Sequence, residues 1–192
     1  MEERSLSVIR ISVRNLVEFV LRSGDLDNRR TAGAKKEAMQ AGGRLHRKIQ
    51  KRMGSEYRAE VSLKHTVDEE EFKLLVEGRA DGVIEEAAGC VIDEIKCIYM
   101  DLKYLEDADP VHLAQAKCYA YFLACDRELA AMGVQITYCN IESEEVRRFR
   151  FDYSFEELEE WFLGLVHEYV KWARFQYLHG LRRQQSLKDL QF

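Results

Sequence analysis

The most constraining feature of the sequence is the stretch EGRADGVIEEAAGCVIDEIKCI, which runs from Glu77 to Ile98. Two runs of apolar, β-forming residues flank the polar segment EEAAG, which is the pattern of two antiparallel strands joined by a turn. Charged residues interrupt both runs, although a charge is expensive to bury unless it is paired or bound to a metal. The chain must therefore fold around a β-hairpin that carries charge between its apolar positions.

The position of the turn predicts which of these charged residues meet. With the turn centred near Ala87, facing residues have numbers that sum to about 174, so Asp81 lies beside Asp93 and Glu94. Glu94 and Lys96 are two apart and project from one face, while Asp93 projects from the other. One acid on each strand and one lysine are therefore expected to converge. A register slip of one residue would exchange Glu94 for Asp93 as the second acid.

Converging carboxylates beside a lysine predict a definite chemistry. Two carboxylates a few ångströms apart repel unless a proton or a divalent cation lies between them, and oxygen ligands suit Mg²⁺ or Mn²⁺. Lys96 would then face an incoming phosphate or a metal-bound water, which is an arrangement for hydrolysing a phosphodiester. The alternative is that Glu94 and Lys96 form an ordinary ion pair on a solvated face of the sheet.

The remainder of the chain alternates helical and β patterns. We expect helices at 13–23, 34–53, 110–129 and 155–178, with Gly24 placed to stop the first. We expect strands at 56–67, 72–84, 90–98, 134–141 and 146–153. Asp109 and Pro110 begin the third helix, and a capping box of Ser154 and Glu157 begins the last, with Gly180 beyond its end. This order predicts a mixed α/β fold with a central mixed sheet of about five strands flanked by helices.

Length and composition limit the class of protein. A chain of 192 residues with 46% hydrophobic residues predicts one domain, which we place at 1–183, with 184–192 as a tail or the start of a connection to a further domain. No apolar run approaches the roughly 20 residues of a membrane span and no secretory signal is visible, so a cytoplasmic protein is expected. The five cysteines form no CxxC pair, which indicates neither a disulfide framework nor a zinc or iron–sulfur site.

Local charge is more informative than the net charge of −5, which argues against a broadly basic nucleic-acid coat but leaves room for a basic groove. Two basic groups stand out: Arg44, Arg47, Lys48, Lys51 and Arg52 in the second helix, and Arg147, Arg148 and Arg150 in the last strand. Both favour contact with DNA phosphates. The alternative for the helix is an ordinary solvated face.

Four separated signals occur in a fixed order: His46, then Gly78-Arg79-Ala80-Asp81, then Glu94-Ile95-Lys96, then Gln115 and Tyr119. Together they resemble the RecB-like branch of the PD-(D/E)xK nuclease superfamily. The resemblance implies a restriction-endonuclease-like fold and a Mg²⁺- or Mn²⁺-dependent DNA nuclease that acts in repair, recombination or processing. It implies a metal site of His46, Asp81 and Glu94, all three of which match family positions. It also implies that Asp81, Glu94, Lys96, Gln115 and Tyr119 are catalytic, the last two forming the QxxxY motif.

Taken singly, each of these residues also has a purely structural explanation. His46 could be a surface histidine of a basic helix, and Tyr119 could be an aromatic residue of the core. No proline precedes Asp81, and no cysteine follows Cys139, which disfavours the family's iron–sulfur subgroups. The N-terminal ISVRNLVEFVLRSGDLDNR resembles the opening of bacterial helicases related to DinG and XPD, which implies a covalent helicase partner C-terminal to this chain. Two other classes remain: a catalytically silent DNA-binding guide domain of the same fold, and an interaction domain that binds no nucleic acid.

Overall fold

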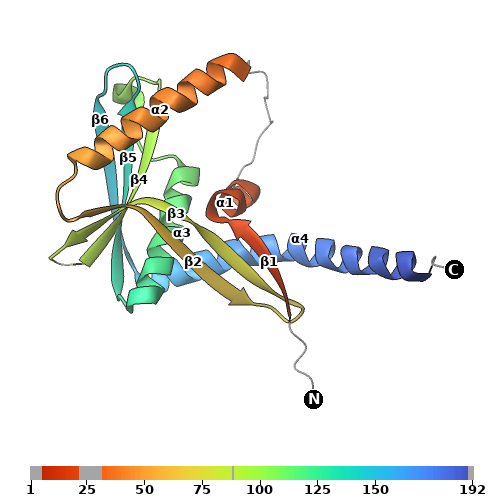
Figure 1. Ribbon diagram of the computed structural model, residues 1–192. Coiled ribbons are helices and arrows are strands. Elements are labelled where there is room, and N and C mark those ends of the chain that lie inside the picture. Colours follow the sequence, from red (N-terminus) through yellow and green to blue (C-terminus); the bar gives the residue numbers. More distant parts are fainter. Residues whose placement is uncertain (1–5, 22–31, 88, 190–192) are drawn as a thin grey trace.

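The computed structural model describes residues 6–21, 32–87 and 89–189, which form a mixed sheet flanked by helices (Figure 1). The strands are β1 (Ser7–Ser12), β2 (Tyr57–Asp68), β3 (Phe72–Glu86), β4 (Gly89–Ile98), β5 (Ala131–Asn140) and β6 (Val146–Ser154). The helices are α1 (Val13–Leu21), α2 (Ala32–Arg52), α3 (Pro110–Arg127) and α4 (Phe155–Asp189), with a short 3₁₀ turn, η1, at Leu102–Tyr104. The expected restriction-endonuclease-like α/β fold is confirmed, and the expected order of elements is recovered with one strand added.

The feature of the sheet that matters most for function is the way strand β3 is shared between partners. The strand order is β1-β3-β4-β5-β6, and β2 pairs antiparallel with β3 along nearly its whole length. Because a strand has only two edges, β1 and β4 must share the other edge of β3. β1 pairs in parallel with Phe72 to Glu77 of β3, and β4 pairs antiparallel with Gly82 to Glu86 of β3. Residues 78–81 therefore lie on an edge with no strand partner among the described residues.

The same divergence is seen from β4. Its pairing with β3 stops at Asp93, whereas its parallel pairing with β5 continues to Ile98. The sheet consequently fans apart, with β1 to β3 running one way and the ends of β4 to β6 the other (Figure 1). The two acids that the sequence predicts to converge, Asp81 and Glu94, lie one residue beyond the last β3–β4 pair.

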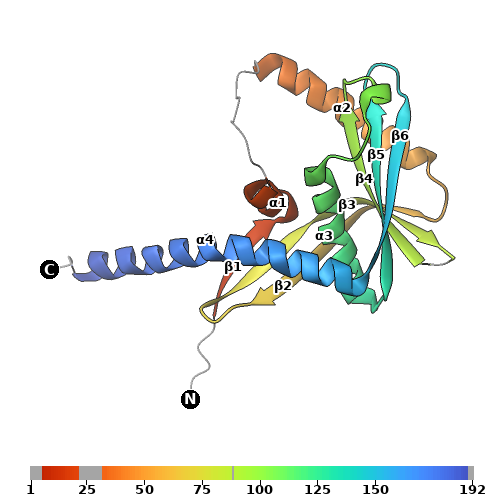
Figure 2. The same ribbon diagram turned by 180° about the vertical axis from the view of Figure 1, so that it is seen from behind.

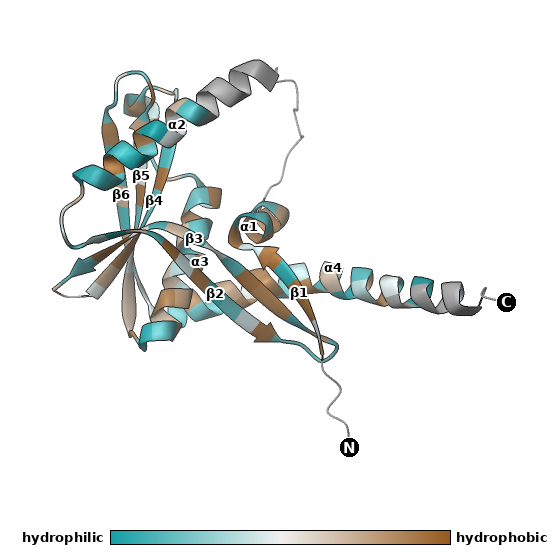
Figure 3. Cartoon of the chain, in the orientation of Figure 1, coloured by the Kyte–Doolittle hydropathy of each residue, from teal (hydrophilic) through white to brown (hydrophobic). Residues whose placement is uncertain are grey.

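Two helical layers cover the two faces of this sheet. α1, α3 and α4 cover one face of the sheet (Figure 2). They enclose the main apolar core, in which Phe122 of α3 and Phe162 of α4 pack edge to face. α2 lies on the opposite face, where Leu45 and Ile49 form a smaller apolar cluster with Ile95 and Cys139. Most of the described part of α2 outside this contact is hydrophilic (Figure 3). The site residues on α2 and α3 therefore approach β4 from different layers.

Local signals fix the helix starts as expected. The Asp109 carboxylate accepts the backbone N–H of Val111 at 2.7 Å, which caps α3. The capping box of α4 is also present, because Glu157 Oε2 accepts from the backbone N–H of Ser154 at 2.8 Å and Ser154 Oγ accepts from that of Glu157 at 3.2 Å.

Two expectations about the chain ends need correction. β1 was not predicted, because the adjacent apolar residues Val8 and Ile9 break the alternation within Ser7–Ser12 and the strand forms by non-local parallel pairing with β3. α4 does not end near Leu178 but continues through Gly180 to Asp189. A single glycine within a helix costs only about 1 kcal/mol, which good helix formers on both sides can offset. Residues 190–192 of the expected tail lie outside the described residues. No helix in the described ranges is both long and apolar enough to cross a membrane.

Candidate active site

The carboxylate of Asp81 closes the gap where β3 and β4 separate. Its Oδ2 accepts the backbone N–H of Ile95 at 2.8 Å, in place of the ladder bond that the divergence removes. A carboxylate held by a backbone donor in this way has little freedom to turn. The observed register, with Gly82 opposite Asp93, is one residue from the predicted one and still brings Asp81 to the second strand.

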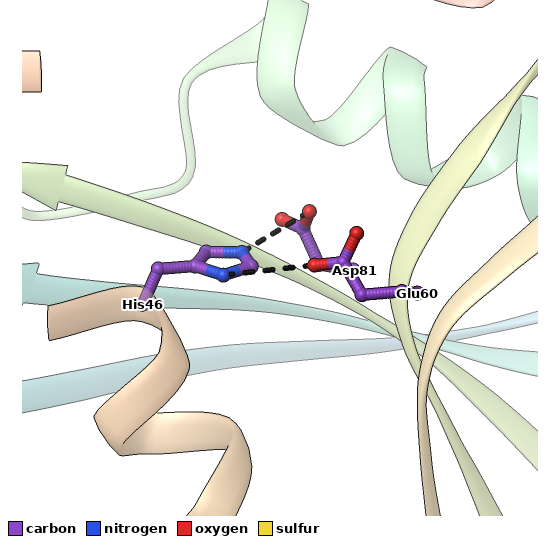
Figure 4. Close-up of side chains that lie close together, drawn as sticks. All are labelled: His46, Glu60 and Asp81. Atoms are coloured by element: carbon purple, nitrogen blue, oxygen red, sulfur yellow. Dashed lines mark ion pairs between the residues drawn. The ribbon is translucent and has the colours of Figure 1, made fainter. Parts of the chain in front are cut away.

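His46 reaches Asp81 from α2. Its neighbours Leu45 and Ile49 are buried against β4 and β5, and this packing directs His46 towards the gap, where Nε2 lies 3.1 Å from Asp81 Oδ1. The hydrogen bond to Asp81 raises the pKa of His46 above its usual value, against the opposing effect of partial burial. Glu60 of β2 approaches the other side of the ring, with Oε1 3.9 Å from Nδ1 (Figure 4).

Glu94 and Lys96 form the second half of the site, on the face that α3 covers. Lys96 Nζ donates to Glu94 Oε1 at 2.7 Å and to Gln115 Oε1 at 2.9 Å. Glu94 is only 5% exposed, and burial, reinforced by the nearby charge of Asp81, raises its pKa to about 7. The ion pair is therefore half-buried, and it does not lie on the solvated sheet face that was the alternative reading.

One oxygen of Glu94 is unusual. Oε2 is buried and has no hydrogen-bond partner within the described part of the chain. A buried carboxylate oxygen without a donor is costly, and such groups call for a missing partner. With the charges of Asp81 and His46 both acting on Glu94, a divalent cation fits this position by charge and by donor type.

Of the predicted metal ligands, His46 and Asp81 lie together, and their charges act on Glu94, but the group whose ligand atoms lie close together differs from the predicted set. Ligand atoms of His46, Asp81 and Glu60 all lie within 4.8 Å of one another. Glu60 was missed from the sequence. The acidic residues 69–71 mark the turn between β2 and β3, and a turn centred there places Glu60 opposite Asp81. This strand register could have identified Glu60 from the sequence.

Tyr119 lies one helical turn from Gln115 on α3, as expected, but it contacts β3 and not Lys96. Its hydroxyl packs over Gly78, where an added Cβ would lie 2.6 Å from the hydroxyl oxygen. The backbone of Arg79 hydrogen bonds to the same hydroxyl, and burial raises the pKa of Tyr119. Tyr119 therefore braces the unpaired edge of β3 next to Asp81, whereas Gln115 holds Lys96. Gly78 is required here because any side chain would displace the tyrosine.

Asp93, the alternative second acid, points away from this cluster. It is fully buried and accepts from Thr137 Oγ1 at 2.5 Å, Gln135 Nε2 at 3.0 Å and Tyr57 Oη at 3.2 Å. With three donors already in place, its carboxylate has a structural role in the sheet. Glu94, not Asp93, is the acid beside Lys96.

We expect Asp93→Asn to destabilise the fold without removing the site. The NH₂ group of the new amide would face the hydroxyl and amide donors that now bind the carboxylate, and donors cannot hydrogen bond to one another. This should lower the free energy of unfolding by about 2–3 kcal/mol. Urea unfolding measures this loss, and calorimetry on the folded variant should give an unchanged affinity for Mn²⁺. Asp126→Asn, at an exposed position of α3, is the matched control. A variant of normal stability that no longer binds cation would contradict this assignment.

The basic residues of α2 differ in their surroundings. Arg44, Arg47 and Lys51 are exposed, whereas the Lys48 ammonium donates to both carboxylate oxygens of Glu144. In the second basic group, Arg150 pairs with Glu86 at 2.7 Å and Arg147 donates to the Leu102 carbonyl at 3.0 Å. Several of the basic side chains that were expected to contact DNA are therefore paired within the protein.

Comparison with known proteins identifies the fold class. No protein-family model matches the chain, and no curated protein sequence matches it significantly. The crystal structure of an alkaline exonuclease (LHK-Exo) in complex with dAMP is similar over 92% of this chain and 94% of its own, with 14% identity and a TM-score of 0.59. Another structure of this exonuclease, from Laribacter hongkongensis, gives 14% identity, 93% and 94% coverage and a TM-score of 0.51. The crystal structure of SSO0001 matches 84% of this chain and 75% of its own, with 17% identity and a TM-score of 0.57. The chain therefore shares its fold with an alkaline exonuclease.

Proposed function

We propose that the protein is a metal-dependent DNA nuclease, and that the site between β3 and β4 hydrolyses phosphodiester bonds. One observation carries the proposal: Oε2 of Glu94 is buried without a partner among the described residues, while Oε1 of the same carboxylate pairs with Lys96 and the charges of Asp81 and His46 act on it. Buried polar atoms in folded proteins nearly always have a partner, so this oxygen is a natural position for a bound cation. The alkaline exonuclease with the same fold supports the reaction class.

His46 Nε2, Asp81 and Glu94 would hold the cation, and Mg²⁺ or Mn²⁺ is favoured because two of the three donors are carboxylates. A bound cation would polarise the phosphate and lower the pKa of a water. The protein's own groups do the rest. Lys96 offsets the negative charge that develops on the phosphate, and Gln115 holds the lysine in place through its 2.9 Å hydrogen bond. Tyr119 fixes the β3 edge that presents Asp81.

The finer parts of the proposal rest on the sequence. The four motifs favour membership of the RecB-like branch and a role in DNA repair, recombination or processing. The N-terminal segment favours a nuclease domain at 1–183 followed by a helicase, and a cytoplasmic location is proposed because no membrane span or secretory signal is visible. The exposed Arg44, Arg47 and Lys51 would contact DNA phosphates, together with Lys48 if DNA displaces Glu144. The dAMP bound to the alkaline exonuclease supports a nucleotide substrate.

The direct test is cleavage of end-labelled single-stranded, duplex and flap DNA by the purified chain in Mg²⁺, in Mn²⁺ and in chelator. Cleavage that requires the cation and disappears with chelator is the expected result. DNA binding with no cleavage above the no-protein background would replace this proposal by the guide-domain function. Neither binding nor cleavage would favour an interaction domain.

Cation binding should release protons and strengthen with pH. The pKa of Glu94 is raised to about 7 and that of His46 is raised as well, so both sites hold protons below neutrality that a cation must displace. We therefore expect the affinity for Mn²⁺ to be at least about tenfold weaker at about pH 6 than at about pH 8. Calorimetry in two buffers of different ionisation enthalpy measures the released protons directly. Binding near pH 6.5 without proton release would contradict the assignment of Glu94 and His46 as ligands.

A further inference from the structure

The backbone of β2 is distorted at the residue that faces Asp81. Glu60 has φ of 58°, in the left-handed region that a residue with a side chain rarely adopts. The β2–β3 pairing continues on both sides, with Ala59 opposite Gly82 and Val61 opposite Ala80, but it skips the pair formed by Glu60 and Asp81. Such strain persists only where the surroundings impose it, and it often marks a functional position.

Side chains of α2 and β3 bind groups of Asp81 and Glu60 at this missing strand pair. The Asp81 carbonyl accepts from Gln50 Nε2 at 2.9 Å, and the same amide donates to Glu60 Oε1 at 3.0 Å. Arg79 Nε lies 2.6 Å from the other oxygen, Glu60 Oε2. Both carboxylate oxygens of Glu60 therefore already accept from neighbouring side chains, which suits an orienting group better than a direct metal ligand.

The anchored carboxylate faces the imidazole of His46. His46 and Gln50 are four residues apart on α2 and share one face. His46 points to Glu60 and Asp81 (Figure 4), and Gln50 donates to the same two residues. Glu60 Oε1 is 3.9 Å from His46 Nδ1, while Nε2 is directed at Asp81. A ring nitrogen that faces a carboxylate keeps its hydrogen when the other nitrogen binds a metal.

We propose that Glu60 is a positioning residue for His46. When a cation is bound, a small closure of the 3.9 Å separation lets the Glu60 carboxylate accept the Nδ1 hydrogen, which leaves the Nε2 lone pair directed at the cation held with Asp81. The left-handed backbone at Glu60 is the conformation that brings this carboxylate to the ring. The inference rests on the proposed metal-dependent function and adds a residue that none of the sequence motifs includes.

The strain gives the test a particular form. Glu60→Gly removes the carboxylate and relieves the positive φ, so the melting temperature should equal or exceed that of the unmodified protein while the affinity for Mn²⁺ falls about 10- to 100-fold. Glu128→Gly is the matched control, because Glu128 is exposed at the C-terminal cap of α3 with φ of 54°. That variant should show a similar melting temperature and unchanged affinity. A parallel fall in melting temperature and affinity in Glu60→Gly would mark Glu60 as structural and overturn the proposal.

A spectroscopic measurement separates positioning from direct ligation. Long-range ¹H–¹⁵N correlation spectra of the Mg²⁺-saturated protein should show His46 as the Nδ1–H tautomer, with Glu60→Gly giving a mixture. Glu60→Gln keeps an acceptor oxygen and should restore most of the tautomer and of the affinity. Unchanged tautomer and affinity in Glu60→Gly would overturn the proposal even if the protein cleaves DNA. If the affinity and tautomer change as expected but no DNA is cleaved, the nuclease function fails and the role of Glu60 stands.

Discussion

Lys96→Ala should cleave DNA at least about a hundredfold more slowly than the unmodified protein while binding DNA almost normally, since this is the usual scale for losing one group that stabilises charge in the transition state. The side chain is half-buried, and its ammonium is fixed by Glu94 Oε1 and Gln115 Oε1. Such a preorganised charge acts on the reacting phosphate more than on the bound duplex. Single-turnover cleavage rates and DNA affinities of the two proteins measure the difference.

Cation binding by Lys96→Ala should be measured at about pH 8. The charge of Lys96 lowers the pKa of Glu94, so its removal raises that pKa further and weakens cation binding near neutrality for an indirect reason. Lys171→Ala is the control, because Lys171 is exposed on α4 and pairs with its neighbour Glu168, far in the sequence from the site. Equal losses of DNA affinity and cleavage rate in Lys96→Ala would show a binding role and contradict the transition-state role.

Asp81→Asn should abolish cleavage by removing the cation. The affinity for Mn²⁺ is expected to fall by more than about a hundredfold, because even partners outside the direct ligands are worth about 10- to 100-fold. The fold should survive, since the amide oxygen of the new side chain can still accept the Ile95 N–H. Calorimetry and thermal unfolding of the same sample test both statements.

The exposed acid Asp126 again provides a control, and Asp126→Asn should match the unmodified protein in cation affinity and cleavage rate. Retained cation affinity in Asp81→Asn would exclude Asp81 as a ligand. Cleavage that persists with that affinity would place the reaction outside the β3–β4 site and refute the proposed mechanism as a whole.

The sequence by itself determined the parts of this protein that depend on neighbouring residues. Alternation fixed which side chains share a strand face, so Glu94 and Lys96 could be placed together and Asp93 on the other side. The EEAAG turn fixed the hairpin register to within one residue. Caps at Asp109 and Ser154 fixed two helix starts. Each of these signals acts over a few residues, so no tertiary information is needed to read it.

Only the tertiary structure decided which strands pair with each part of β3 and which backbone groups of β3 are left without a strand partner. The short strand β1 occupies half of one edge of β3, and β4 leaves the other half after Gly82, so a gap opens beside Asp81. No local pattern encodes this divergence, because it results from competition between distant segments for one strand edge. The positions of Glu60 against His46 and of Tyr119 against Gly78 follow from the same gap. They depend on which backbone groups lack partners, and this is settled only when the whole sheet has assembled.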